Sequence, residues 1–340
     1  MSGVEDTIAV KLSVISTPLN HHKLKSLILI QLPNTKNSIL QKITFSEITQ
    51  KDISLYIKRE DLIHTDVSGN KYRKLKYNLI QASEEKKSTL LTFGGAYSNH
   101  IAAVASVGKL NNFKTIGIIR GDELGIDLEK TLKNNPTLRF AHECGMRFKF
   151  ISRSDYREKS SKEFSVCLKK EFGNFYLIPE GGTNDLAIKG CEEILNKETE
   201  KFDYICVAVG TGGTISGLIN SAKNHQKIIG FQALKGGFLE EEIKKYAKEN
   251  ECWSLISKYH FGGYAKTNNE LIAFINQLKE ETKIPLDPIY TGKMMYGIVD
   301  LIQDGFFKKG TKILMIHTGG LQGIEGMNEI LKKNNSLIIR

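Results

Sequence analysis

The stretch "YICVAVGTGGTISGL", Tyr204 to Leu218, joins an apolar strand pattern to a helical pattern through a glycine-rich turn. In such a turn the free N–H groups of the first helical turn and the helix dipole both point toward a bound anion. The hydroxyls of Thr211 and Thr214 add donors beside Gly212 and Gly213. We therefore predict an anion-binding cup at residues 211–214, at the carboxyl end of a strand.

The spacing within this turn limits which anion it can bind. A dinucleotide fingerprint needs a third glycine where this chain has Ile215, and a Walker loop needs a lysine after Gly217, where Leu218 stands. The cup is therefore expected to hold a smaller phosphate ester rather than a nucleotide.

Outward from the cup, short strand-like runs alternate with helical patterns along most of the chain. Runs rich in Ile, Val, Phe and Tyr that alternate with helices are typical of β-α units and a mainly parallel sheet. The predicted fold class is thus α/β, with open, mainly parallel sheets and helices on both faces. Strands are expected at 55–59, 89–93, 114–120, 175–179, 203–210, 227–233 and 311–320, and helices at 72–84, 99–110, 185–196, 214–223, 238–248 and 321–333.

The net charge of +10 comes from 48 Lys plus Arg against 38 Asp plus Glu in 340 residues. The basic residues are interspersed with acidic ones and form no stripe with neighbouring aromatic residues, which a nucleic-acid footprint would require. A solvated basic surface is expected, with no nucleic-acid partner.

Five cysteines without a C-x-x-C pair indicate neither a disulfide framework nor a zinc site, so no metal is expected. The first residues carry acids and no basic segment before an apolar run, and the longest early run, "LILI", is too short to cross a bilayer. We expect a cytoplasmic protein without membrane contact. Residues 1 to about 40 are less regular and could wrap the body or contact a second subunit; the sequence does not decide.

Six Gly-Gly pairs recur, most of them after a strand-like run and before a helix. That place is the edge at which open α/β sheets bind ligands, although glycine also simply permits tight turns. For "KGGF" alone the plain turn is favoured, but the set suggests a backbone that approaches a ligand closely. The pairs begin at Gly94, Gly181, Gly212, Gly236, Gly262 and Gly319.

The helix that starts in "SGNKYRKLKYNL", residues 68–79, carries four basic residues in its first two turns. Positive charge is unfavourable at this end of a helix, because the macrodipole is already positive there. A bound anion near Lys71 and Lys74 would remove the conflict. Arg73 and Lys76 receive no such role and are expected to be surface charges.

Seven motifs in this order resemble those of the tryptophan-synthase-β-like pyridoxal-phosphate enzymes of fold type II. The closer match is to the subgroup of 1-aminocyclopropane-1-carboxylate deaminase and D-cysteine desulfhydrase. The resemblance implies pyridoxal 5'-phosphate in a cleft between a small inserted domain, 74–175, and a large domain made of 1–73 and 176–340, and it suggests a homodimer. The motifs are "KREDL", "GNKYRKL", "GGAYSNH", "PEGGTN", "GTGGTISG", "DPIYTGK" and "HTGG", between Lys58 and about Gly323.

The resemblance also implies roles for single residues. Lys71 matches the lysine that bonds to the cofactor aldehyde, a role for which burial and the helix start would supply a neutral, nucleophilic amine. Lys74 matches a phosphate-contacting lysine, and Asn99 the residue that bonds the cofactor's 3-hydroxyl. Ser98 matches a serine at the substrate carboxylate, although Ser98 or Asn99 could also simply cap a helix.

Two tyrosines and two threonines bear on the reaction. Tyr290 and Tyr264 match tyrosines near the substrate, with plain aromatic packing an even alternative for Tyr264. Cyclopropane deaminases resemble one another in having Glu at position 291 and Leu at position 318, whereas this chain has Thr291 and Thr318, like the desulfhydrases. Without a carboxylate the pyridine ring is a weaker electron sink, which suffices when thiolate leaves.

The implied reaction is therefore α,β-elimination of D-cysteine, or a related β-substituted amino acid, to pyruvate, ammonia and hydrogen sulfide. Cyclopropane ring opening to 2-oxobutanoate is the alternative, and a non-enzymatic binding protein that retains the fold is a third. Tyr97 stands where the family usually has Gln, so the substrate stays open. The enantiomer stays open as well, because it depends on the face of the cofactor–substrate adduct that Lys71 reaches.

Overall fold

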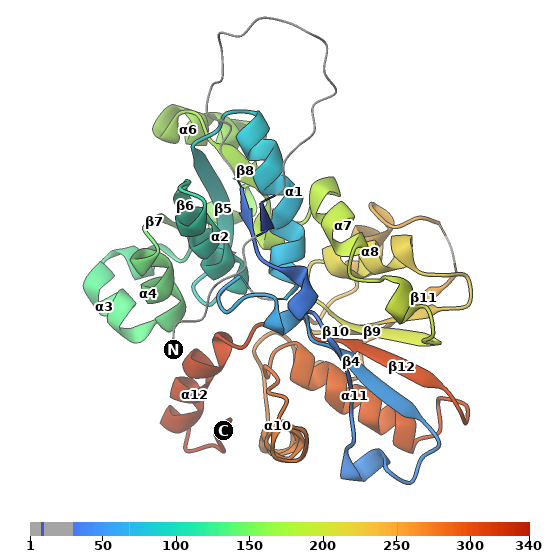
Figure 1. Cartoon of the computed structure of the whole chain (residues 1–340). Coiled ribbons are helices and arrows are strands. Elements are labelled where there is room, and N and C mark those ends of the chain that lie inside the picture. The colour runs from blue at the N-terminus through green and yellow to red at the C-terminus, as the bar shows by residue number, and fades with distance from the viewer. Residues whose placement is uncertain (1–7, 10–29, 68, 250) are drawn as a thin grey trace, which may run out of the picture.

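The computed structural model describes residues 8–9, 30–67, 69–249 and 251–340. Most of the N-terminal segment for which an arm is considered, residues 1–7 and 10–29, lies outside the described residues. The described part contains two mainly parallel sheets that lie side by side (Figure 1). A small antiparallel pair, β1 (Ile8–Ala9) and β2 (Gln31–Leu32), adjoins them.

The larger sheet has six strands in the order β11-β10-β9-β12-β4-β3. Neighbouring strands run parallel, except that β3 pairs antiparallel with β4 at one edge. β12, from the C-terminal part of the chain, thus lies in the middle of the sheet between β4 and β9. The strands are β3 (Leu40–Lys42), β4 (Ser54–Lys58), β9 (Tyr204–Val209), β10 (Lys227–Gln232), β11 (Trp253–Ile256) and β12 (Lys312–Ile316).

Alternation along β9 explains why helices cover both faces of this sheet. Ile205, Val207 and Val209 pack with α7 (Asp185–Glu192), α8 (Gly213–Ser221) and α9 (Leu239–Lys244). Cys206 and Ala208 point to the opposite face and pack with α10 (Asn269–Thr282) and α11 (Thr291–Gln303). Both sides of the strand are therefore apolar, as parallel sheets require.

The smaller sheet has four parallel strands in the order β7-β6-β5-β8. Leu90 of β5 packs toward one face and Leu91 toward the other. The strands are β5 (Thr89–Gly95), β6 (Lys114–Arg120), β7 (Met146–Ile151) and β8 (Tyr176–Ile178). One face carries α1 (Asn70–Glu84), α2 (Asn99–Leu110) and α4 (Pro136–Glu143), and the other carries α5 (Arg153–Arg157) and α6 (Lys162–Phe172).

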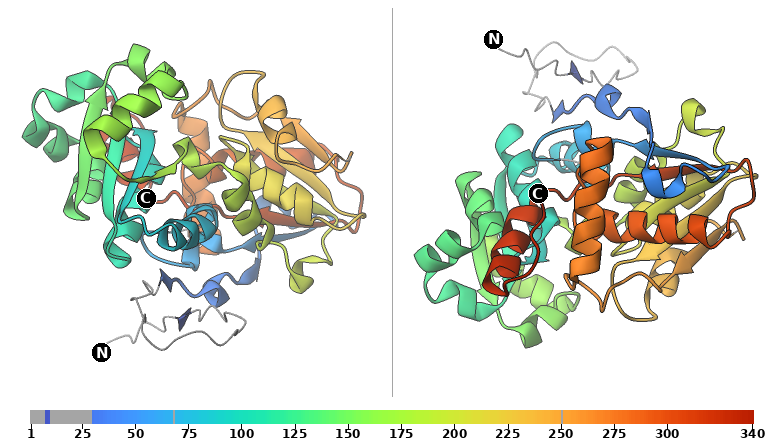
Figure 2. Two further views of the ribbon diagram at one scale, coloured as in Figure 1. Left: turned by 90° about the horizontal axis from the view of Figure 1, so that it is seen from above. Right: turned by 90° about the horizontal axis from the view of Figure 1, so that it is seen from below.

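The remaining helices connect these layers. α3 (Leu128–Asn134) precedes α4, and α12 (Gly323–Lys333) crosses from the larger sheet to lie beside α4 (Figure 2), where Arg139 and Glu325 form a 3.1 Å ion pair. No helix among the described residues is both long and apolar enough to cross a bilayer. The 3₁₀ turns are Thr35–Asn37, Ser46–Ile48, Glu60–Leu62, Asp122–Gly125, Glu180–Gly182 and Lys197–Thr199.

The division into a small domain at 74–175 and a large domain at 1–73 and 176–340 stays a prediction. β8 lies just beyond the expected boundary yet hydrogen-bonds to β5 of the smaller sheet, and α1 runs through position 74 without a break. We therefore propose that the small domain extends to about residue 178, with α1 as the shared helix.

Candidate active site

The carboxyl ends of both sheets open onto one cleft of about 940 Å³. The loops after β5, β8, β9 and β12 all reach it, together with the start of α1. Every residue predicted for the site lines this cleft except Thr291. The lining members are Lys71, Lys74, Ser98, Asn99, Thr211, Gly212, Gly213, Thr214, Tyr264, Tyr290 and Thr318.

Four of the six Gly-Gly pairs contribute to the lining, through Gly95, Gly181, Gly212–Gly213 and Gly319–Gly320. The other two pairs, which begin at Gly236 and Gly262, do not line the cleft. The plain-turn interpretation of "KGGF" fits the structure, and glycine gathers where the backbone borders the cleft.

The predicted anion cup forms the floor of the cleft at the start of α8. Gly212 is the residue before the helix and has a positive φ of 81°. The ammonium of Lys74 donates to the Gly181 carbonyl at 3.0 Å and to the Thr211 hydroxyl at 3.4 Å. A Cβ on Gly213 would lie 3.0 Å from Lys74 Nζ. Glycine thus keeps open a space that hydroxyls, backbone N–H groups and an ammonium surround.

The start of α1 meets the start of α8 across this floor. The side-chain amide of Asn70 donates to the Thr214 hydroxyl at 2.8 Å. Gly69, with φ +64°, lies so close to the loop after β12 that a Cβ would come 2.0 Å from the Thr318 carbonyl oxygen. The positive ends of two helix dipoles therefore converge beside Lys71, which follows Asn70.

Lys71 carries an amine of low basicity. Burial and the neighbouring ammonium of Lys74 lower its pKa from the usual 10.5 to about 7. Within the described part of the chain, it donates a hydrogen bond to the Asn70 side-chain oxygen, at 3.3 Å. A large fraction of this amine is neutral near pH 7, so it can attack a carbonyl group or accept a proton.

The expectation that Arg73 is a surface charge is wrong. Its guanidinium is buried and makes two hydrogen bonds to Glu60, at 2.7 and 3.0 Å. Lys76, on the outer side, pairs with Glu193 at 2.6 Å. Local carboxylates therefore neutralise these two cations, whereas the side chains of Lys71 and Lys74 line the cleft.

The loop after β5 forms one wall of the cleft. Ser98 caps α2 by accepting a 3.4 Å hydrogen bond from the Ile101 N–H, so the capping alternative holds while Ser98 also lines the cleft. The Asn99 amide nitrogen lies 3.0 Å from where a Cβ on Gly320 would be. The ring of Tyr97 lies against Gly326 of α12, 3.1 Å from a Cβ built there.

Tyr290 and Tyr264 form the opposite wall. Their rings meet edge to face with centroids 6.3 Å apart, and Tyr290 closely approaches Gly210, where a Cβ would lie 3.2 Å from the ring. Burial raises the pKa of both phenols, so both stay protonated near neutral pH. Lys293 supports this wall by donating to the carbonyls of His260 and Gly263 at 2.9 and 2.8 Å, just before Tyr264.

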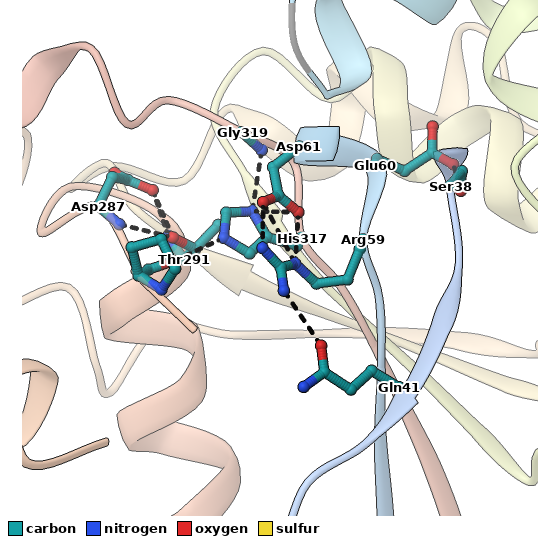
Figure 3. Close-up of polar contacts among 10 residues, drawn as sticks. Ser38, Gln41, Arg59, Glu60, Asp61, Asp287, Thr291, His317 and Gly319 are labelled. Atoms are coloured by element: carbon teal, nitrogen blue, oxygen red, sulfur yellow. Dashed lines mark hydrogen bonds and ion pairs between the residues drawn. The ribbon is translucent and has the colours of Figure 1, made fainter. Parts of the chain in front are cut away.

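Thr291 lies behind the cleft rather than in it. Its hydroxyl donates to the Asp287 carboxylate (Figure 3). That carboxylate also accepts the backbone N–H groups of Ile289, Tyr290 and Thr291. Thr318 lines the cleft instead.

The residue before Thr318, His317, is fixed by its neighbours. Its Nδ1 accepts from the Gly319 N–H at 3.2 Å and its Nε2 donates to the Pro285 carbonyl at 2.8 Å, so hydrogen bonds hold the ring at both nitrogens. Asp61, 3.6 Å from Nδ1, is bound by Arg59 (Figure 3). The HTGG loop is thereby tied to the end of β4 and to the segment before Asp287.

A family model described as "Pyridoxal-phosphate dependent enzyme" matches residues 32–319. The chain belongs to this family. The chain is 33% identical over 287 residues to a putative 1-aminocyclopropane-1-carboxylate deaminase from Pyrococcus horikoshii, covering 79% of this chain and 85% of the relative. It is 31% identical to the bifunctional D-cysteine desulfhydrase/1-aminocyclopropane-1-carboxylate deaminase of Arabidopsis thaliana, over 79% of this chain and 73% of the relative.

The crystal structure of a 1-aminocyclopropane-1-carboxylate deaminase homologue matches the fold with a TM-score of 0.71 and 29% identity, over 88% of this chain and 96% of that one. The predicted α/β fold of type II and the cofactor, pyridoxal 5'-phosphate, are therefore confirmed. The chain is an enzyme of the deaminase and desulfhydrase family, which excludes the non-enzymatic alternative.

The cleft of this pyridoxal-phosphate enzyme fits the cofactor chemically. Glycine leaves space at the cup, and Lys74, Thr211 and Thr214 supply donors suited to a phosphate. An amine with a pKa of about 7 suits an aldehyde. These donors line the cleft, and the amine of Lys71 lies within the same cleft.

Four further residues of the cleft and its support were missed from the sequence. His100 lines the cleft, is buried, and is held by Thr92 at 2.8 Å. Arg120 ends β6, and Glu180 follows β8. Lys293 lies outside the cleft but anchors the Tyr264 loop. His100 and Glu180 stand inside the quoted motifs, whereas nothing near Arg120 in the sequence marks it.

Proposed function

We propose that the enzyme catalyses α,β-elimination of D-cysteine, or a related β-substituted amino acid, to pyruvate, ammonia and hydrogen sulfide. The observation that carries this proposal is the low-basicity amine of Lys71, placed in one cleft with the anion cup, the Ser98 loop and the hydroxyl of Thr318. Bound pyridoxal phosphate would supply the electron sink for cleavage at the α carbon.

The binding roles follow from the donors of the cleft. Lys74 and the hydroxyls of Thr211 and Thr214, with Gly212 and Gly213 giving access to backbone N–H groups, would hold the phosphate. Lys71 would hold the aldehyde carbon, and Asn99 the ring hydroxyl. Ser98 and the N-terminus of α2 would orient the substrate carboxylate, because this helix end favours an anion.

Lys71 and Tyr290 would have different roles in the elimination. The amine of Lys71, released when substrate binds, would take the proton from the α carbon, for which a pKa near the working pH is favourable. Tyr290 stays protonated because burial raises its pKa, so it can donate a hydrogen bond to the β substituent as that group leaves. Tyr264, edge-on to Tyr290, would limit the position of that phenol.

Elimination is favoured over ring opening because the end of the cleft that Thr318 lines offers a hydroxyl where the cyclopropane deaminases have Leu, and position 291 holds a threonine instead of their Glu. Asp287 lies behind the cleft, with its oxygens already accepting four donors. Thiolate is a good leaving group and needs less electron withdrawal than a strained carbon–carbon bond. The hydrogen sulfide-producing activity is therefore the first candidate.

Ring opening of 1-aminocyclopropane-1-carboxylate to 2-oxobutanoate and ammonia is the second candidate. It is supported by the names of the relatives from Pyrococcus horikoshii and Arabidopsis thaliana, the second of which carries both activities. Both reactions would use the same lysine and the same cup.

The test is a panel of D- and L-cysteine, β-chloro-D-alanine and the cyclopropane acid, supplied to holoenzyme, with 2-oxo acid products identified by chromatography. Pyruvate and sulfide from a cysteine enantiomer support elimination, whereas 2-oxobutanoate as the main product supports the second candidate. Lys71→Ala should abolish turnover and the visible absorbance of bound cofactor. Lys76→Ala, which removes an amine already paired with Glu193, is the control and should retain both.

The homodimer and the cytoplasmic location stay predictions. Size-exclusion chromatography with light scattering measures the first directly.

A further inference from the structure

One wall of the cleft carries more cations than the cofactor requires. Arg120, Arg153, Arg157 and Lys159 line it, and we call these four residues the basic wall. They come from the carboxyl end of β6, from α5 and from the segment that follows α5. None of them belongs to the phosphate cup, which lies at the start of α8.

The carboxylates on this side are already neutralised. Glu123 pairs with Arg153 through contacts of 2.6 and 3.1 Å. Glu180 pairs with Lys159 at 3.2 Å and accepts the Tyr156 hydroxyl at 2.8 Å. Among the described residues, no carboxylate forms an ion pair with Arg120, so its charge is available to a ligand.

Arg120 is held in place although its guanidinium reaches the cleft. The guanidinium lies over the ring of Tyr156, 5.7 Å from the centroid. That ring is buried, packs edge to face on Phe93 at 6.2 Å, and is fixed at its hydroxyl by Glu180. A rigid aromatic support of this kind reduces the entropy lost when a guanidinium binds an oxyanion.

The guanidinium also faces the substrate side of the cleft. Arg120 Nη2 would lie 3.6 Å from a Cβ on Gly95, the last residue of β5 before the loop that carries Ser98. The positive charge of Arg120 also acts on Tyr264. It favours the phenolate and so offsets part of the rise that burial causes in the pKa of Tyr264. Arg120 thus lies beside the loop of the proposed carboxylate site, in the same cleft that the two tyrosines line.

We propose that Arg120 forms an oxyanion subsite for the β substituent, so that the enzyme takes amino acids whose β carbon carries a sulfonate or a phosphate ester group. This inference rests on the proposed elimination and names its substrate class. A guanidinium pairs with such groups through two parallel hydrogen bonds.

The elimination is balanced for these substrates. The Cα–H bond breaks and its proton goes to the Lys71 amine, while the bond from Cβ to the substituent breaks and the electron pair leaves with the substituent. Hydrolysis then yields pyruvate and ammonium. For cysteate, substrate plus water gives pyruvate, ammonium and hydrogen sulfite, and for O-phosphoserine the third product is hydrogen phosphate. No oxidant or reductant is needed.

The kinetic test compares holoenzyme, Arg120→Gln and Arg147→Gln on both enantiomers of cysteine, cysteate and O-phosphoserine, with pyruvate release as the readout. Arg147 is an exposed arginine on the neighbouring strand β7, near its amino end, and does not line the cleft. We expect Arg120→Gln to lower kcat/KM for the oxyanion substrates about 10- to 100-fold, the range for a charge-assisted hydrogen bond, and to change the value for cysteine less than about threefold. Arg147→Gln should change neither.

Equal losses of kcat/KM on every substrate would place Arg120 at the shared α-carboxylate and overturn the proposal. The proposal also fails if wild-type enzyme processes cysteine but accepts no oxyanion substrate. A binding measurement separates failure of the subsite from failure of the proposed elimination. Calorimetry with 3-phosphonopropionate and with butyrate needs no turnover. The phosphonate should bind wild-type holoenzyme about 10-fold or more tighter than Arg120→Gln, with butyrate unchanged; equal affinities overturn the subsite even if cysteine is a substrate.

Discussion

The hydroxyl of Thr291 donates a 2.5 Å hydrogen bond to the carboxylate of Asp287, four residues earlier. In return, the Asp287 N–H donates to the same hydroxyl oxygen at 3.0 Å. Asp287 also accepts the first N–H groups of the segment that opens α11, so it acts as the cap that this helix otherwise lacks. Because Tyr290 is the residue directly before the helix, the Asp287–Thr291 pair fixes the backbone position from which the Tyr290 side chain extends.

Thr291→Val should therefore lower stability and activity through Tyr290 rather than through the cofactor ring. Loss of one charged, buried hydrogen bond costs about 1–3 kcal/mol. Thr291→Ser keeps the hydroxyl and should restore most of the loss. Chemical unfolding and kcat/KM for the best substrate measure both effects. If Ser behaves like Val, the hydroxyl bond does not position Tyr290.

Lys74 should depress the basicity of Lys71 measurably. In cofactor-free enzyme the neutral Lys71 amine, with a pKa of about 7, should react with an acylating reagent in a pH profile centred near 7. Lys74→Met removes a nearby positive charge, which makes the Lys71 ammonium more favourable and raises its pKa, so the profile moves to higher pH. Burial, the larger cause, persists and keeps the midpoint below 10.5.

Peptide mass spectrometry of the modified lysine follows this profile residue by residue. Lys76→Met is the matched control, since Lys76 lies on the same helix but is neutralised by Glu193. A profile for Lys71 that stays in place in Lys74→Met contradicts the electrostatic coupling.

Gly69→Ala tests how tightly the loops of the site pack. Both Gly69 and Gly145 have positive φ, and alanine at either costs about 1–3 kcal/mol for the backbone conformation alone. A Cβ on Gly69 would also lie 2.0 Å from the Thr318 carbonyl, whereas nothing lies within 4 Å at Gly145. We expect Gly69→Ala to shift the urea midpoint well beyond Gly145→Ala and to weaken cofactor retention. Equal shifts would mean that the loop after β12 moves freely.

Lys293→Met should loosen the wall that carries Tyr264. The mutation leaves the carbonyls of His260 and Gly263 without their ammonium partner, in a loop that contains positive φ at Phe261, Gly262 and Gly263. Hydrogen exchange of residues 260–265 should accelerate and kcat/KM should fall about 10-fold or more, while the cofactor absorbance stays. Burial lowers the pKa of Lys293 to about 8, and a neutral amine still has two hydrogens for the two carbonyls, so the wall should persist above pH 8. Unchanged exchange in Lys293→Met would contradict this support.

Much of the fold follows from local patterns, because most strands of these sheets are short, apolar runs that alternate with helical patterns. β6 and α2 lie at the positions expected from 114–120 and 99–110. β7, "MRFKFI", was not predicted, because Arg147 and Lys149 interrupt its apolar pattern at the edge of the smaller sheet. α11 was missed since its start depends on Asp287 as a distant cap rather than on a residue directly before it.

The candidate site was predictable where neighbouring residues of one motif form a part of it together, as in the cup and the Asn70–Lys71–Lys74 segment. The sequence could not show that Arg73 is buried, since its partner, Glu60, lies thirteen residues earlier on another element. Nor could it show the support of Arg120, because Tyr156 and Phe93 meet only when α5 packs on the smaller sheet.

The central place of β12 in the larger sheet also bears on how the chain is made. β4 leaves the ribosome more than 250 residues before β12, and the two are neighbours in the finished sheet. Until β12 is synthesised, β4 and β9 lack the strand that lies between them, so the nascent protein exposes unpaired strand edges for most of its translation. Premature stop codons before residue 312 should therefore produce aggregating fragments and not a shortened enzyme.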